Sequence, residues 1–243
     1  MNTIASTRLS LPLGRTENQS PVSLDLDTSA HTLVVGDPGT GKTVLVRGLA
    51  EAANRRGFRV STHYDEYALC VLPDLLGEAT RRNAVLDSFG VKRSEDLPAS
   101  VLAASDFRPV MLIIEDYAYG RFMPGAAPLS DRAKRLRASV LEFMRATRLR
   151  EHAAGIHLVI VSERPDSEML PAKALAGFGN VIMTVRPGKA PSPERLTAAF
   201  YGMAEPGDVT EAAASAAAAG TYGQAILADG DVAQFRFGIA GEE

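Results

Sequence analysis

A glycine-rich run near the start of the sequence combines the residue types and the spacing that bind phosphate. It satisfies the pattern G-x-x-x-x-G-K-[ST] in full, reading Gly36, Asp37, Pro38, Gly39, Thr40, Gly41, Lys42 and Thr43. Glycines let the backbone curl until successive N–H groups point at phosphate oxygens. A lysine in this place reaches the β- and γ-phosphates of a nucleotide, and the hydroxyl after it is a ligand for Mg²⁺. The run therefore predicts an ATP site in which all eight residues contact the nucleotide, Lys42 acts in catalysis and Thr43 holds Mg²⁺.

Two neighbouring carboxylates follow an apolar run further along the chain. Residues 110–114 are five apolar residues in a row, and Glu115 and Asp116 come directly after them. In P-loop ATPases a carboxylate at such a strand end holds magnesium, and a neighbouring one polarises the attacking water. The usual order is Asp then Glu, and here it is reversed. Either the metal is held differently and hydrolysis is slower, or Asp116 takes the metal role, so both acids are candidates for catalysis and metal binding.

The phosphate-binding run needs a strand before it and a helix after it. Residues 31–35 form a compact apolar run, which is typical of a buried strand. Residues 42–55 carry apolar side chains at helical spacing. We therefore expect a strand–loop–helix unit whose helix aims the positive end of its dipole at the phosphates.

Further strands and helices alternate along the chain and predict the fold class. We expect strands at 58–62, 110–114, 156–161 and 181–185, a long helix at 130–154, and a C-terminal hairpin with strands at 222–227 and 232–237. Two or three short helices, broken near Pro73, Gly90 and Pro98, should fill residues 64–108. Alternating strands and helices favour an α/β fold, here a RecA-like P-loop NTPase core with a mostly parallel central sheet, flanking helices and the C-terminal β-hairpin.

No linker divides the sequence, so we expect one domain over residues 1–243. Within it, residues 1–30 are a leading segment with a short edge strand near 22–26, and residues 31–243 are the core.

Composition narrows the classes of function. The net charge of −3 does not suit a protein that binds nucleic acid over its whole surface, although a ring can gather positive charge on one inner face. The basic pairs Arg81-Arg82 and 92–93 either face DNA or are ordinary surface residues. No apolar run reaches the roughly 18 residues that a membrane helix needs, so we expect no direct membrane insertion. With a single cysteine, we expect a cytoplasmic location.

These motifs, taken in order, resemble the FtsK/SpoIIIE superfamily of ring-forming motor ATPases. The matching segments cover about residues 9–238, and they are 11–14 with 22–26, 31–43, 113–118, and 153–160 with 162–165. The last pair is the most specific to the family, in which it is the helix-to-strand junction that ends in a polar sensor. The resemblance implies ATP-driven movement of double-stranded DNA through a hexameric homo-oligomeric ring. One branch of the family instead powers type VII protein secretion, and the Asp-Pro in the loop looks somewhat like that branch.

The resemblance also assigns further catalytic candidates. Glu163 stands where the family has a sensor glutamine. His152 stands where an arginine is often found, so Arg148 and Arg150 are the nearest substitutes for an arginine finger that reaches a neighbouring subunit. Three functions follow as hypotheses: an ATP-driven double-stranded DNA translocase, a nucleotide-binding assembly or regulatory module with weak hydrolysis, and a type VII-like protein-export ATPase.

Overall fold

The structure is a computed structural model of the chain. It describes residues 9–26, 31–115, 117, 131–148, 155–163, 170–175, 177–200, 204–229 and 231–237, without the side chains of 65, 66, 95, 146–148, 172 and 173. Asp116 and Arg150 lie outside the described residues, as does the side chain of Arg148.

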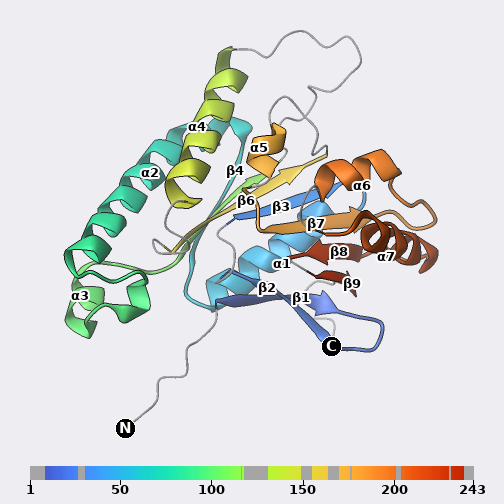
Figure 1. Cartoon of the computed structure of the whole chain (residues 1–243), viewed down its shortest axis with the longest axis horizontal. Coiled ribbons are helices and arrows are strands. Elements are labelled where there is room, and N and C mark those ends of the chain that lie inside the picture. Colours follow the sequence, from blue (N-terminus) through green and yellow to red (C-terminus); the bar gives the residue numbers. More distant parts are fainter. Residues whose placement is uncertain are drawn as a thin grey trace.

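A nine-stranded mixed sheet forms the framework, in the order β2-β1-β9-β8-β7-β3-β6-β5-β4 (Figure 1). The strands are β1 (Ser10–Arg15), β2 (Pro21–Asp25), β3 (His31–Gly36), β4 (Arg59–Tyr64), β5 (Val110–Glu115), β6 (Ile156–Ser162), β7 (Asn180–Val185), β8 (Gln224–Ala228) and β9 (Val232–Arg236). The predicted α/β class is confirmed.

The sheet has a parallel and an antiparallel half. The run from β7 through β3, β6 and β5 to β4 is parallel, whereas the pairings among β7, β8, β9, β1 and β2 are antiparallel. The prediction of a mostly parallel sheet therefore holds for only one half of the sheet, because the other half is antiparallel. Because the carboxyl ends of parallel strands meet at one edge, the chain segments after β3, β5 and β6 converge there, which is where ligands bind in such sheets.

Helices cover both faces of the sheet (Figure 1). They are α1 (Lys42–Arg55), α2 (Asp65–Ser88), the 3₁₀ turn η1 (Ser94–Asp96), α3 (Ala99–Ala104), α4 (Asp131–Arg148), α5 (Ala172–Leu175), α6 (Pro193–Ala199) and α7 (Pro206–Ala218). One hydrophobic cluster joins α1 to β1, β2 and one face of the parallel strands, and a second joins α2, α4, α6 and α7 to the other face. No helix in the described part of the chain has both the length and the apolar character that crossing a bilayer requires.

The central strands are apolar throughout because both faces are covered. All seven residues of β6 and all six of β3 and β7 are buried. Period-two alternation then divides each strand between the two clusters. On β5, for example, Ile113 packs with the α1 cluster, and Leu112 and Ile114 pack with the α2 and α4 cluster.

The expected break at Pro73 is wrong, because α2 runs unbroken from Asp65 to Ser88 with Pro73 inside it. A proline within a helix removes one hydrogen bond and costs about 3 kcal/mol. Leu72, Leu75 and Ala79 form a buried stripe along this helix, at 1%, 6% and 1% exposure. Burying each large apolar side chain contributes about 1.5–3 kcal/mol, so packing against the sheet and α4 outweighs the local penalty.

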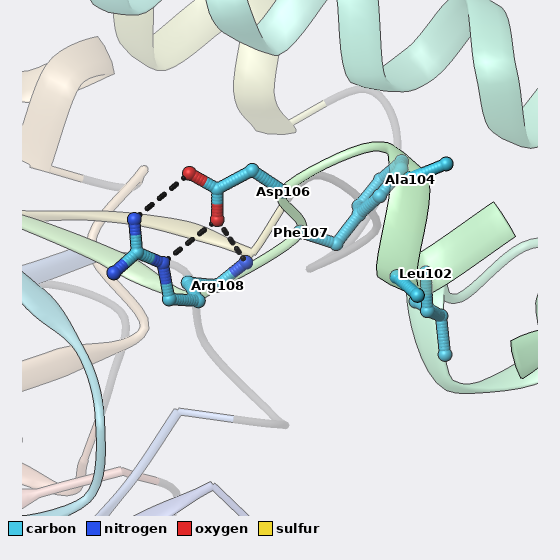
Figure 2. A pocket seen from close by; sticks show the side chains of 6 residues that line it. Leu102, Ala104, Asp106, Phe107 and Arg108 are labelled. Carbon is cyan, nitrogen blue, oxygen red and sulfur yellow. Dashed lines mark hydrogen bonds and ion pairs between the residues drawn. The ribbon is translucent and has the colours of Figure 1, made fainter. Parts of the chain in front are cut away.

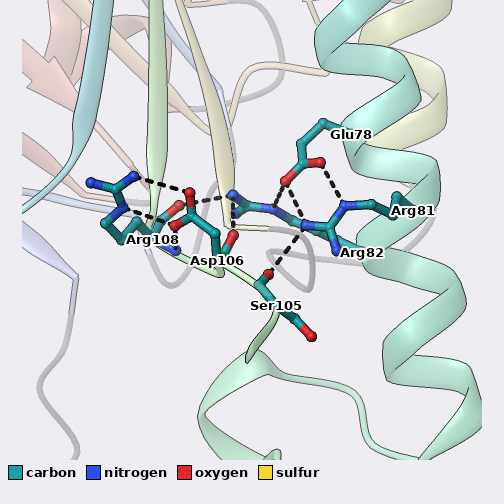
Figure 3. Close-up of polar contacts among 6 residues, drawn as sticks. All are labelled: Glu78, Arg81, Arg82, Ser105, Asp106 and Arg108. Carbon is teal, nitrogen blue, oxygen red and sulfur yellow. Dashed lines mark hydrogen bonds and ion pairs between the residues drawn. The ribbon is translucent and has the colours of Figure 1, made fainter. Parts of the chain in front are cut away.

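A buried ion pair fixes α2 to the segment that leads into β5 (Figure 3). Arg82 is 1% exposed, and its Nε lies 2.7 Å from Glu78 Oε1. Its Nη2 donates to the carbonyls of Asp106 and Arg108 at 3.1 and 3.0 Å. The hydrogen bond from Arg81 is the largest influence on the pKa of Glu78, burial opposes it, and Arg82 adds to it, so this pKa falls from 4.5 to about 2. Arg82 therefore cannot face DNA.

A hollow of about 530 Å³ lies in the segment that leads into β5 (Figure 2). It is lined by Leu102, Ala103, Ala104, Asp106, Phe107 and Arg108. These residues precede β5, so the hollow lies at the amino ends of the parallel strands, opposite the edge that the glycine-rich loop occupies.

Arg81 and Arg82 form a matched pair for testing this anchor, because both donate to Glu78 while Arg81 is 44% exposed. We expect Arg82→Gln to lower the free energy of unfolding by about 1.5–3 kcal/mol, since it removes the buried hydrogen bonds of the guanidinium to Glu78 and to the carbonyls of Asp106 and Arg108. Arg81→Gln should cost less than about 1 kcal/mol, as exposed pairs do. Urea denaturation measures both, and equal losses would contradict the role given to burial.

Candidate nucleotide-binding site

The glycine-rich loop joins β3 to α1 as the sequence predicts. Gly36 is the last residue of β3, and α1 starts at Lys42 with Gly41 as its N-cap residue at φ 97°. This φ is in the left-handed region, which glycine adopts without strain. Leu45 N donates to Gly41 O at 3.0 Å, which is the first bond of the helix. The amides of Thr43 and Val44 therefore have no intrahelical carbonyl to bind, and a helix start of this kind binds anions.

The ammonium of Lys42 lies folded over the loop. Its Nζ donates to the carbonyls of Gly36 and Asp37, at 2.9 and 3.0 Å. These two bonds hold the ammonium against the residues that would surround a triphosphate. To bind a nucleotide, the Lys42 side chain therefore only needs to exchange these carbonyl acceptors for phosphate oxygens, and the loop itself keeps its hydrogen bonds.

The beginning of the loop is fixed by β7. Gly36 is the register partner of Thr184, and a Cβ on Gly36 would lie 2.0 Å from Thr184 Oγ1. Thr184 Oγ1 is also 2.6 Å from Thr40 Oγ1, which donates to Asp37 O at 2.7 Å. Only glycine fits against the strand here, and the two buried hydroxyls then determine the curl of the loop.

Three further side chains from the C-terminal part of the chain contact the loop. Arg186 Nη2 donates to Pro38 O at 2.9 Å. Arg195, on α6, donates to the Asp37 carboxylate and to the carbonyl of Glu163. Phe237 lies so close to the start of α1 that a Cβ on Gly41 would be 3.0 Å from its ring. No pattern in the sequence indicates these three side chains or Thr184, because only the arrangement of strands in the sheet brings them to the loop.

Glu115 ends β5 at the same edge of the sheet as the loop. Both β5 and β3 pair with β6, which lies between them. Glu115 comes one residue after Ile114, the register partner of Ile160. Gly36 comes one residue after Val35, the register partner of Ser162. Strand alternation continues from Ile113 and places Glu115 on the face that α1 covers. Asp116 lies outside the described residues, so the structure places only one of the two predicted acids.

Of the remaining candidates, Glu163 is the one that the structure brings to the loop. It directly follows β6, and its carbonyl accepts from Arg195, which also binds Asp37. Arg148 is the last residue of α4. Its side chain and the whole of Arg150 lie outside the described residues. Tyr117 is buried at 1% exposure, and its amide donates to Val161 O on β6. Tyr117 is therefore held against β6.

The residues present fit a magnesium–nucleotide complex. The loop offers backbone amides and a lysine for phosphate, and Thr43 is exposed in the first turn of α1. A hydroxyl and a carboxylate are the hard oxygen ligands that Mg²⁺ takes beside phosphate. Thr43 and Glu115 are the described residues that would supply them.

The fold and the loop define a P-loop nucleotide-binding protein of the α/β class. A family model described as the AAA ATPase domain matches residues 15–167, which is more than half of the chain. The chain therefore belongs to the AAA ATPase domain family. No curated protein matches its sequence.

Solved structures share the fold. The conjugation coupling protein TcpA of pCW3, solved as a monomer with ATPγS, has a TM-score of 0.75 and 16% identity, over 97% of this chain and 67% of TcpA. The cytoplasmic domain of the type VII secretion ATPase EccC from Thermomonospora curvata has a TM-score of 0.65 and 15% identity, over 97% of this chain and 29% of EccC. The cytoplasmic domain of EssC has a TM-score of 0.56 and 14% identity, over 98% and 44%. The family model confirms the predicted P-loop ATPase, these structures share its fold, and this chain spans only part of each of these relatives.

We expect Thr184→Val to weaken ATP binding several-fold. The substitution keeps the shape but removes a hydroxyl on which Thr40 depends, and a lost buried hydrogen bond costs about 1–3 kcal/mol. Thr184→Ser is the matched control, because it keeps the hydroxyl. Calorimetric titration with Mg²⁺ and ATPγS measures the affinity, and a valine variant that binds as tightly as the serine variant would contradict the role of the hydroxyl pair.

We expect Glu115→Gln to lower ATP turnover about 100-fold or more, as the loss of a catalytic acid or base does, while ATPγS still binds. Asp116→Asn should have the smaller effect, because alternation directs Glu115 towards α1. Steady-state hydrolysis measures both, with Glu17→Gln in the exposed turn after β1 as the control for a lost carboxylate. Equal, small effects would show that neither acid is catalytic.

Proposed function

We propose that this chain is an ATP-hydrolysing motor domain that assembles into a ring and moves double-stranded DNA. The observation that carries the nucleotide chemistry is the loop between β3 and α1, with Lys42 on its carbonyls and Glu115 at the same edge of the sheet. Membership of the AAA ATPase domain family supports hydrolysis.

Each residue of the site has a proposed task. The amides at the start of α1 bind the phosphates, and Lys42 leaves the carbonyls of Gly36 and Asp37 to bind the β- and γ-phosphates. Thr43 and Glu115 hold Mg²⁺, which when bound neutralises charge on the phosphates. Glu115, or Asp116 beside it, orients and polarises the attacking water.

The DNA substrate and the ring rest on the family resemblance. Residues 153–165 carry the most family-specific match in the sequence. The fold likeness to the conjugation coupling protein TcpA extends over 97% of this chain and supports the same proposal. In a ring, the arginines near the end of α4, Arg148 and Arg150, would reach the nucleotide of a neighbour and stabilise its phosphates.

Two other functions have specific observations in their favour. Glu163 in the sensor position and the reversed acids favour a nucleotide-dependent assembly module with weak hydrolysis. The fold likeness to EccC favours a protein-export ATPase. Both use the same nucleotide site, and they differ from the first proposal in what stimulates turnover.

The test is ATP hydrolysis with and without double-stranded DNA, together with the mass of the protein at equilibrium with and without ATP. We expect DNA to stimulate turnover at about 50 mM salt and much less at about 200 mM, because phosphate contacts weaken steeply with salt. Lys42→Ala should lower turnover about 100-fold or more, as the loss of one preorganised charge contact does.

The outcomes separate the three functions. Turnover that DNA leaves unchanged at low salt would overturn the translocase. ATP-dependent assembly with turnover near background would favour the assembly module. A stable complex with an exported protein, without DNA binding, would favour the export ATPase.

A further inference from the structure

Arg195 joins two parts of the nucleotide site that are distant in the sequence. It lies in the first turn of α6, where its backbone N–H donates to the hydroxyl of the N-cap residue Ser192 at 3.4 Å. Leu196 and Ala199 of this helix are buried in the hydrophobic core, which fixes the position of α6. From there the Arg195 guanidinium donates to the carboxylate of Asp37 in the loop and to the carbonyl of Glu163 after β6.

Asp37 is an unfavourable residue for an anion site. It follows Gly36 directly, and its own carbonyl accepts from Lys42, so its charge lies within the loop that would bind the phosphates. A triphosphate carries several negative charges, and a like charge nearby repels it. The side chains of Asp37 and Arg195 are only 35% and 22% exposed, so water screens this repulsion incompletely.

We infer that Arg195 is a positioning residue for nucleotide binding: it neutralises Asp37 and holds the loop to the end of β6. The inference rests on the proposed nucleotide site and adds a residue that the phosphate-binding pattern does not contain. Because Arg195 also binds the carbonyl of Glu163, the loop cannot move relative to the segment after β6 without breaking one of its two contacts. The affinity for a triphosphate therefore depends on a side chain that need not touch it.

The test is a charge-exchange series measured by calorimetric titration with Mg²⁺ and ATPγS at low and at high salt. We expect Arg195→Gln to weaken binding about tenfold or more at low salt, because Asp37 is then an unneutralised charge. Asp37→Asn alone should tighten binding about threefold, because Arg195 is then a net positive charge beside the phosphates, and high salt should reduce this gain. The double variant should bind within about threefold of the unaltered chain.

The double variant distinguishes a role of the Arg195 charge from a purely structural role of its side chain. A double variant as weak as Arg195→Gln would overturn the inference, because a purely structural arginine is not replaced by removing its partner's charge. Weakened binding by Asp37→Asn would overturn it as well, and this variant gives an answer even if Arg195→Gln fails to fold. Arg108→Gln breaks an exposed ion pair with Asp106 at the opposite edge of the sheet (Figure 3) and is the control for a lost arginine.

Lys42→Ala in the same titration distinguishes the inference from the proposed function. If it binds ATPγS as tightly as the unaltered chain, the nucleotide site itself is wrong. If it loses binding while the double variant is not rescued, only the role of Arg195 is wrong.

Discussion

The close approach of Gly36 to Thr184 is the constraint on which the nucleotide site depends. The two residues are register partners on β3 and β7, and a Cβ on Gly36 would come within 2.0 Å of the threonine hydroxyl. With glycine in place, the hydroxyls of Thr184 and Thr40 come to 2.6 Å, and Thr40 binds back to the carbonyl of Asp37. The curl of the loop and the start of α1 follow from this contact. The phosphate-binding pattern is thus local in sequence, but the strand beside it gives the loop its shape.

The two halves of the sheet have different tasks. The parallel strands bring the loop, Glu115 and Glu163 to one edge. The antiparallel half and its helices hold the loop from the other side, through Arg195 on α6 and Phe237 after β9. At the opposite edge, Arg82 and Glu78 fix α2 to the connection before β5. The anchor of α2 and the predicted nucleotide site therefore lie at opposite ends of the parallel strands, and the hollow near Phe107 contains none of the predicted site residues.

Much of this arrangement could be predicted from the sequence, and the failures have physical reasons. The strand–loop–helix unit was predictable because its signals are local: α1 covers Lys42–Arg55 as expected. The strand at 110–114 was predictable because a strand covered on both faces is apolar throughout. Pro73 misled because a local breaking signal was outweighed by tertiary packing. The expectation that the pair Arg81-Arg82 faces DNA or lies on the surface failed for Arg82, because a basic pair in a sequence does not show which member is buried. Thr184, Arg186 and Arg195 could not be found, since they reach the loop only through the adjacency of β3 and β7. The single-domain organisation, the ring and the arginine finger stay predictions.

The most direct test of the account is a crystal structure of the chain with Mg²⁺ and ATPγS. We expect the phosphates to lie against the amides at the start of α1 and Thr184 and Thr40 to keep their contact. Lys42 Nζ should have exchanged the carbonyls of Gly36 and Asp37 for phosphate oxygens. A nucleotide bound elsewhere, or Lys42 still bonded to the carbonyls of Gly36 and Asp37 at saturating ATPγS, would contradict the proposed nucleotide site.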